Sequence, residues 1–327
     1  MSEPISFVQA INLGLQEAME ADPKVLLLGE DVEDGQSGGA FKVSKGLSTR
    51  FGVERVRGTP ISEQAIMGAA VGAAIAGYRP IAEIMFMNFL TVGMDQLVNH
   101  AAKIRFMSGG RTSVPLTVRC STGAGVGFGG QHSDMLEAWL AHVPGLKVAT
   151  ASNPADAKGL LLSAIEDNDP TVFIENVAMY QSKGAPPAPG YKVPLGKAAI
   201  SRAGDDLTIV TYGRPVLDAL AVAEDFAAEG VSVEVIDLRT IAPWDEAAVL
   251  NSVARTKRAI VLHEAVKNFG AGGEIASRIH EELFSDLKKP VKRIGSKYAV
   301  VPFASPLEKT FLYSREEIAS AIRAQLD

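Results

Sequence analysis

This sequence of 327 residues contains a single cysteine, has no net positive charge and has no long apolar run. The single cysteine, Cys120, excludes a disulfide framework within the chain and predicts a reducing compartment such as the cytoplasm. Because Cys120 follows an apolar segment, we interpret it as a small packing residue rather than a nucleophile. The formal net charge of -6 argues against general nucleic-acid binding, which requires a basic surface.

No apolar run is long enough to predict a membrane span. The most apolar stretch, Ala65 to Tyr78, is shorter than the ~18 to 20 residues that a spanning helix needs. The start of the chain lacks a basic region followed by an apolar core, so we expect no secretory signal. Within the apolar stretch, Gly68 and Gly72 are spaced so that two helix backbones can approach closely, which predicts a buried helix packed tightly against another.

Strand and helix patterns alternate along the chain, which predicts an α/β fold with open, mainly parallel sheets covered on both faces. Prolines 186, 187, 189 and 194 mark residues 181–195 as a linker. We therefore predict a first domain at 1–180 and a second, smaller domain at 196–327. The predicted strands are 25–31, 80–86, 114–119, 146–150 and 171–176, then 206–212, 231–238, 258–264 and 291–295. The predicted helices lie near 6–20, 62–77, 89–107, 133–141 and 154–167, then near 215–228, 245–254, 271–284 and 315–325.

A glycine-rich turn, "GAGVGFGGQHS" at 123–133, follows one of these strands. Gly125, Gly127 and Gly130 satisfy G-x-G-x-x-G, the pattern that cradles a dinucleotide pyrophosphate. Dinucleotide sites also place an acidic residue about 20 residues further on, where this chain has Thr150 and its neighbours. The pattern therefore favours either a purely structural turn or a turn that presents His132 for chemistry at the end of a strand.

A second candidate is Glu63, which follows Pro60 at the start of the predicted helix near 62–77. A carboxylate at this place can simply complement the helix dipole. The helix that follows is one of the most apolar in the chain, so we expect Glu63 to be largely buried and to need a partner, such as a protonatable ring nitrogen.

Several long motifs in conserved order resemble a known family. They are "LLLGEDV", "GAFKVSKGL", "TPISEQAIMGAAVGAA", "GYRPIAEIMFMNF", "DQLVNHAAKIRFMSGG", "GQHSDMLEAWLAHVPGLKV", "DAKGLLLSAIEDNDPTVFIEN" and "VEVIDLRTIAPWDE". Together they resemble the β subunit of the thiamine-diphosphate-dependent first component of 2-oxo acid dehydrogenase complexes, with the pyruvate and acetoin enzymes most similar. The resemblance implies a pyrimidine-binding domain followed by a transketolase C-terminal-like domain.

The resemblance also implies roles for individual residues. Glu63 would hydrogen-bond the aminopyrimidine ring and so promote proton removal from the thiazolium, Phe89 would pack against that ring, and Glu30 would lie near the cofactor. His132 would orient and protonate intermediates while the acyl group passes to a lipoyl arm. A structural potassium site, typical of the family, would involve Leu116, Ala164, Ile165, Asp167 and Asp169.

The sequence lacks the Gly-Asp-Gly motif that usually supplies the Mg²⁺ ligands for thiamine diphosphate. The diphosphate half of the site is therefore expected from another polypeptide. This agrees with the family architecture, in which an α subunit binds Mg²⁺ and the diphosphate within a heterotetramer of two α and two β chains. The second domain would support dimerisation and docking on a lipoyl acyltransferase core.

We therefore expect a cytoplasmic enzyme subunit that decarboxylates a 2-oxo acid such as pyruvate and reductively acylates a lipoyl group. Acetoin cleavage is the alternative, followed by a split transketolase-like carbon transfer. A docking subunit without chemistry is the non-enzymatic alternative, which finding no thiamine diphosphate in the purified complex would favour.

Overall fold

The computed structural model describes residues 3–327, which fall into two units. The first unit comprises the residues up to 122 together with 139–195, and the second comprises 123–138 together with 196–327. The change of unit after Leu195 coincides with the end of the proline-rich segment. The glycine-rich turn and His132 belong to the second unit.

The first unit is built on a parallel sheet, as the sequence predicts. Its strands follow the order β6-β7-β5-β4-β2-β3, and neighbouring strands are parallel throughout this run. Every residue of β5 and β7 is buried, because parallel strands are covered on both faces. The strands are β2 (Val25–Gly29), β3 (Val56–Gly58), β4 (Arg79–Phe86), β5 (Thr117–Thr122), β6 (Lys147–Thr150) and β7 (Thr171–Asn176), with a separate antiparallel pair, β1 (Ile5–Ser6) and β8 (Lys183–Gly184).

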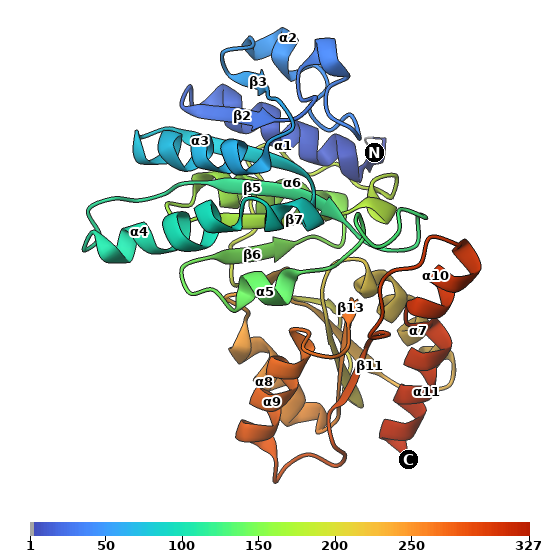
Figure 1. Ribbon diagram of the computed structural model, residues 1–327. Coiled ribbons are helices and arrows are strands. Elements are labelled where there is room, and N and C mark those ends of the chain that lie inside the picture. The colour runs from blue at the N-terminus through green and yellow to red at the C-terminus, as the bar shows by residue number, and fades with distance from the viewer. Residues whose placement is uncertain (1–2) are drawn as a thin grey trace. The chain divides into compact units, whose positions relative to one another are not determined.

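Helices cover both faces of this sheet. Figure 1 shows α1 (Phe7–Ala21) and α6 (Pro154–Glu166) together behind the sheet and α3 (Glu63–Ile75) in front. Ser6 and Asn153 start α1 and α6 by accepting hydrogen bonds from backbone amides in the first turn, which satisfies donors that a helix start leaves unpaired. The shorter helices are η1 (Asp34–Gln36), α2 (Leu47–Phe51), η2 (Met87–Thr91), η3 (Asp95–Ala101), α4 (Ala102–Met107), α5 (Glu137–Ala141) and η4 (Val177–Met179).

The predicted helix near 89–107 is instead broken into η2, η3 and α4, and η3 is a π-helix. Gly93 lies at the break, where a Cβ atom would come within 2.6 Å of Met67 Cγ on α3. The strand predicted at 114–119 begins only at Thr117. Pro115, just before it, has no amide hydrogen to donate to a neighbouring strand.

The second unit has a sheet in the order β14-β13-β10-β11-β9, parallel except for the edge strand β9. Helices α7 and α11 lie on one face and α8 and α9 on the other (Figure 1). The strands are β9 (Ala199–Arg202), β10 (Leu207–Thr211), β11 (Val233–Asp237), β13 (Ala259–Val266) and β14 (Lys292–Ser296), and β12 (Thr240–Ala242) is a further short strand. The helices are α7 (Pro215–Ala228), α8 (Glu246–Thr256), α9 (Gly272–Leu283), α10 (Ser305–Phe311) and α11 (Arg315–Leu326). The sequence predicts all of these except β9, β12 and α10.

None of the helices within residues 3–327 is both long and apolar enough to cross a lipid bilayer.

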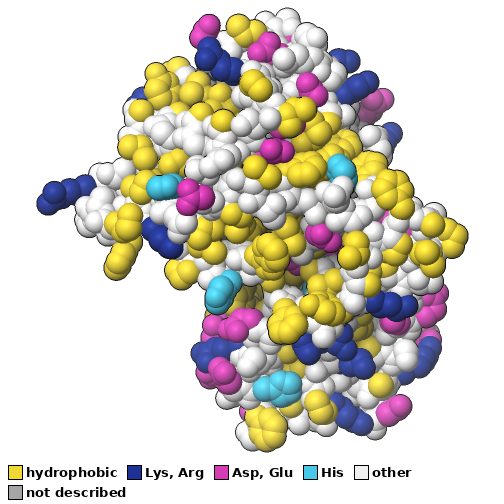
Figure 2. Space-filling model, in the orientation of Figure 1, with side chains coloured by type: hydrophobic (Ala, Val, Ile, Leu, Met, Phe, Trp, Pro, Cys, Tyr) yellow, Lys and Arg dark blue, Asp and Glu magenta, His cyan; other side chains and the backbone are white. Residues whose placement is uncertain are grey.

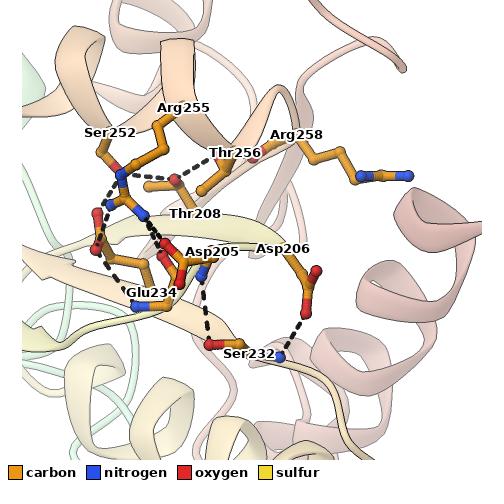
Figure 3. Close-up of polar contacts among 10 residues, drawn as sticks. Asp205, Asp206, Thr208, Ser232, Glu234, Ser252, Arg255, Thr256 and Arg258 are labelled. Atoms are coloured by element: carbon orange, nitrogen blue, oxygen red, sulfur yellow. Dashed lines mark hydrogen bonds and ion pairs between the residues drawn. The ribbon is translucent and has the colours of Figure 1, made fainter.

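A buried carboxylate, Glu234, fastens α8 to the sheet of the second unit (Figure 3). Arg255 Nη2 donates to Glu234 Oε2 at 2.7 Å, and the Ser252 hydroxyl donates to Glu234 Oε1. Arg255 Nη1 also donates to the carbonyl oxygen of Gly204 at 2.6 Å and to Asp205. These bonds link strand β11 to helix α8 and to the turn before β10, and hydrogen bonds between charged groups such as Arg255 and Glu234 are strong.

Replacing Arg255 with methionine is expected to lower the free energy of unfolding by about 2 kcal/mol, because Glu234 stays buried without its cation. The control is Arg57→Met, which removes an ion pair between two exposed side chains, Arg57 and Glu54. Such pairs contribute at most about 1 kcal/mol. Urea unfolding measures both variants, and equal losses would contradict the role given to Arg255.

Candidate functional site

Charged side chains of the first unit gather around the carboxyl end of strand β2. Glu30 directly follows β2, and Glu83 on β4 pairs in register with Gly29, the last residue of β2. Arg119 on β5 pairs in register with Glu83. In open parallel sheets, ligands bind outside this edge. The cluster therefore lies where an α/β domain of this kind presents its chemistry.

Glu30 is buried without a hydrogen-bond partner for its Oε1 atom among residues 3–327. Burial raises the pKa of Glu30, and the negative charges of Glu63, Asp31 and Glu83 raise it further. A carboxyl group in these surroundings favours its protonated form, which can donate a hydrogen bond. Glu30 is thus suited to a polar ligand that completes its hydrogen bonding.

Glu63 is the first residue of α3, and Ser62 precedes it as the capping residue. Its side chain is half-buried, so the sequence-based expectation that Glu63 is largely buried is wrong. The reason is that α3 buries only one face, along Ile66, Met67, Ala70, Val71 and Ala74, while its other face stays exposed. The electrostatic effect of Glu63 on Glu30 shows that the structure brings these two carboxylates together.

Phe89 lies on η2, just after β4, and is half-buried. Its ring meets Phe86 edge to face, with ring centroids 6.3 Å apart. Phe86 in turn meets Phe41 at 5.8 Å, also edge to face. Phe89 therefore belongs to an aromatic row and, being half-buried, retains exposed surface that an aromatic ligand could cover.

Behind the carboxylates lies an ion cluster that the sequence analysis missed. Arg119 is almost completely buried and donates to Glu175 through Nε at 2.7 Å and through Nη2 at 2.9 Å. Its Nη1 donates to Glu83, and the Tyr180 hydroxyl donates to Glu175 Oε2 at 2.7 Å. Neighbouring charges keep Arg119 protonated, since its pKa lies above the ordinary value despite burial. Charged residues within the apolar strands were the available signal.

His132 is half-buried in the second unit, and its amide donates to the Gly129 carbonyl at 3.3 Å. The predicted helix near 133–141 begins only at Glu137, so His132 and Ser133 to Leu136 lie in an irregular loop. The amides of Gly125 and Gly127 in the preceding turn donate to the Glu308 carboxylate. The chain's own anion thus occupies the amides that a pyrophosphate would need, which excludes the dinucleotide interpretation of this turn.

The positions that the resemblance assigns to potassium lie together around the end of α6. The Leu116 carbonyl accepts from the Thr171 amide at 2.9 Å, and the Asp167 amide donates to the Ala164 carbonyl at 3.3 Å. Arg79 Nη1 donates to the carbonyls of Ile165 and Asp167 at 3.1 and 3.0 Å.

The two carboxylates of this group already have cationic partners. Lys147 Nζ lies 2.5 Å from Asp167 Oδ2, and Arg105 Nη1 lies 2.6 Å from Asp169 Oδ1. A potassium ion would therefore have to rely on the carbonyl oxygens, each of which has a second lone pair. His, Cys, Asp and Glu side chains form no group of three or more that could hold a metal ion anywhere in residues 3–327.

A second buried carboxylate lies five residues after His132. Glu137 is 0% exposed, and its Oε1 accepts from the Tyr212 hydroxyl at 2.8 Å. Its Oε2 is buried without a hydrogen-bond partner in the described chain. Burial raises the pKa of Glu137 to about 7, and the negative charge of Glu264 adds to the shift. The Tyr212 ring stacks on His263, and burial lowers the pKa of that imidazole to about 4.

Comparison with known proteins assigns both halves of the chain to domain families. The transketolase pyrimidine binding domain matches residues 3–183, and the transketolase C-terminal domain matches residues 196–318. A solved structure described as a split-gene transketolase, an inactive beta4 tetramer, superposes with a TM-score of 0.79 at 20% identity and covers 99% of both chains. The chain is therefore a two-domain protein of transketolase fold.

Curated relatives match over almost the full length. The 2-oxoisovalerate dehydrogenase subunit beta of Bacillus subtilis is 42% identical and covers 98% of both chains. The acetoin:2,6-dichlorophenolindophenol oxidoreductase subunit beta of the same organism is 43% identical and covers 98% of this chain and 96% of that one. The pyruvate dehydrogenase E1 component subunit beta of Staphylococcus epidermidis is 40% identical and covers 99% of both.

The chain belongs to the β-subunit family of the thiamine-diphosphate-dependent E1 components of 2-oxo acid and acetoin dehydrogenases. The family and the α/β fold class predicted from the sequence are both confirmed.

The raised pKa of Glu137 predicts a pH-dependent stability. A carboxyl that binds its proton more tightly when folded stabilises the protein fully below its unfolded pKa of about 4.5, and this contribution is lost as pH rises to about 7. Glu137→Gln removes the titration, so its stability relative to wild type should rise by about 1 to 3 kcal/mol between pH 5 and pH 8. Urea unfolding at both pH values measures this difference.

The control for this experiment is Glu274→Gln, which neutralises an exposed glutamate at the start of α9. Its stability relative to wild type should be nearly the same at both pH values. A Glu137→Gln variant that behaves like this control would show that Glu137 is ionised in the folded protein throughout the range.

Proposed function

We propose that this chain supplies the aminopyrimidine side of a thiamine diphosphate site in a 2-oxo acid dehydrogenase of the pyruvate type. The observation that carries the proposal is the pair of carboxylates Glu30 and Glu63 at the carboxyl edge of the parallel sheet, with Glu30 Oε1 buried and unpaired in the described chain. A ring that offers both hydrogen-bond donors and acceptors, as an aminopyrimidine does, fits this pair.

Thiamine diphosphate, when bound, supplies a carbon nucleophile that adds to a 2-oxo carbonyl and accepts the electron pair left by decarboxylation. Glu63 would hold a proton between its carboxylate and a ring nitrogen, which is general acid–base assistance worth ~10² to 10⁴ in rate. Glu30 would complete its hydrogen bonding on the same ligand, and Phe89 would pack on the ring face. His132 would orient the acyl group and donate a proton during its transfer to a lipoyl group.

Acetoin is the second candidate substrate, because the chain is also 43% identical to an acetoin oxidoreductase β subunit. The identities to the β subunits of the 2-oxoisovalerate and pyruvate enzymes, 42% and 40%, are nearly the same, so sequence similarity does not choose among these substrates. The split transketolase-like alternative is supported only by a likeness of fold at 20% identity.

The relatives are named as β subunits, which supports an α partner for this chain. We propose that the α subunit provides the Mg²⁺ and diphosphate ligands, because this sequence has no Gly-Asp-Gly motif. Two α and two β chains would form the cytoplasmic enzyme, which would dock on a lipoyl acyltransferase core. Exposed apolar side chains on the first unit, such as Ile61, Val92 and Phe106, offer contact area, and Figure 2 shows hydrophobic groups gathered around α3.

Glu63→Gln in the α/β enzyme is expected to lower turnover ~10²- to 10⁴-fold, because the amide cannot exchange a proton with the ring. Turnover would be measured with pyruvate, a branched 2-oxo acid and acetoin, using an artificial electron acceptor. The control, Glu54→Gln, neutralises an exposed glutamate of the same unit and should keep wild-type turnover. Full turnover in Glu63→Gln would refute the proposed role, and the preferred substrate identifies the enzyme. Sugar phosphate products would favour the transketolase-like alternative.

Potassium binding at the end of α6 is proposed only through the carbonyls of Leu116, Ala164, Ile165 and Asp167. We expect a higher melting temperature in KCl than in NaCl of equal ionic strength, because an ion that binds only the folded state stabilises it. The gain is about 1.4 kcal/mol at ten times the dissociation constant. Equal melting temperatures in the two salts would contradict the site.

A further inference from the structure

The glycine-rich turn before His132 has an unusual backbone. Gly123, Gly125, Gly127 and Gly129 all have positive φ, at 111°, 103°, 77° and 71°. Residues with side chains rarely adopt such angles, so glycine is required at alternate positions. Backbone of this kind can turn its amides toward a common centre and form a concave site for an anion.

The anions at this turn are carboxylates of the second unit. Glu308 Oε1 accepts from the Gly125 amide at 2.7 Å, and both of its oxygens lie within 3.2 Å of the Gly127 amide. Glu264 Oε1 accepts from the Ala124 amide at 2.9 Å. Both glutamates are 2% exposed. These hydrogen bonds therefore involve ionisable acceptors shielded from water, where such bonds are strongest.

The same turn also packs against hydrophobic side chains of the second unit. Ala124 forms a small core with Val301 and Phe311, the last of which lies one helical turn from Glu308 on α10. A Cβ atom on Gly129 would come within 2.2 Å of the Phe303 ring, and one on Gly130 within 2.4 Å of Val300 Cγ1. The turn thus fits closely against the segment 300–311, and the Gly129 carbonyl in turn accepts from the His132 amide.

We propose that Glu308, assisted by Glu264, is a positioning residue for His132. The two carboxylates hold the turn through its amides, and the turn fixes the backbone of His132 through Gly129. This inference rests on the proposed function, because it takes His132 to act in acyl transfer. It assigns a role to α10, a helix of the second unit that contains none of the residues proposed to act on the substrate.

Amide hydrogen exchange tests the hydrogen bonds directly, without any cofactor. In Glu308→Ala, the Gly125 and Gly127 amides should exchange about 10- to 100-fold faster, as expected when a hydrogen bond to a charged group is lost. The Ala124 amide, which donates to Glu264, should change less. The control, Lys309→Ala, removes the exposed neighbouring side chain of α10 and should change none of the three.

Kinetics of the α/β enzyme test the positioning role. Glu308→Ala should lower kcat about tenfold or more with an unchanged KM for thiamine diphosphate, because Glu63 and Glu30 belong to the other unit. Glu308→Gln keeps an acceptor oxygen in the same place and should restore most of kcat. A residue that served only stability would lower the amount of active enzyme and leave kcat per active site unchanged.

His132→Ala separates failure of this inference from failure of the proposed function. If His132→Ala lowers kcat while Glu308→Ala leaves either kcat or amide exchange unchanged, the positioning role is wrong and the proposed function stands. If His132→Ala keeps full turnover, the role of His132 in the proposed function is wrong, and the positioning role falls with it. Should Glu308→Ala fail to fold, Glu264→Ala is measured instead. It should then speed exchange at Ala124 and lower kcat, and wild-type values would overturn the proposal.

Discussion

The free energy required to bury a carboxylate explains contacts between distant segments within each of the two units. An ionised carboxylate removed from water needs a cation or several hydrogen-bond donors, and otherwise it takes up a proton. Glu175 has the Arg119 guanidinium, Glu234 has Arg255 and a serine hydroxyl, and Glu308 has backbone amides. Each of these pairings joins segments that are distant in sequence, so satisfying the charge also fixes the local architecture.

Glu30 and Glu137 are the carboxylates whose partners are incomplete in the described chain, since each has one buried oxygen without a hydrogen bond. Both have raised pKa values, mainly because of burial: nearby negative charges add to the shift at Glu30, and burial outweighs the Tyr212 hydrogen bond at Glu137. Groups with perturbed pKa values and unsatisfied atoms are typical of functional sites. For Glu30, the position after β2 and the nearby Glu63 fit a polar aromatic ligand, which is the kind of ligand proposed above. Glu137 has a different setting, in which its Oε1 accepts from the Tyr212 hydroxyl.

The fold was largely predictable because its strands and helices carry strong patterns. Helix α7 begins and ends at the predicted residues, and β7 does too. The prediction was wrong where a local contact interrupts a pattern, as at Gly93, where α3 leaves no room for a side chain. It also missed α10, a short helix with four polar or charged residues and a proline among its seven. The hydrophobic period of a sequence reports burial along one helix or strand. It does not report where two elements pack closely against each other.

The resemblance supplied the proposed site residues, and the structure supplied their environment. The resemblance named Glu30 and Glu63, and the structure brings the two together, although Glu63 is more exposed than an apolar helix suggests. The cation behind them, Arg119, is fixed by pairing between β4, β5 and β7, and strand register of this kind cannot be read from one sequence. Pairings between strands that are distant in sequence therefore account for most of the site features that the sequence did not predict.

The glycine-rich turn shows that a motif can correctly predict the backbone chemistry of a turn and still suggest the wrong ligand. Glycines at alternate positions allow positive φ, and the resulting amides do bind an anion. In a dinucleotide site that anion is supplied from outside the chain. Here Glu308 supplies it from within, more than 180 residues away in sequence. The same backbone chemistry then serves to hold the loop that contains His132, and the distinguishing feature is a buried carboxylate that no local pattern contains.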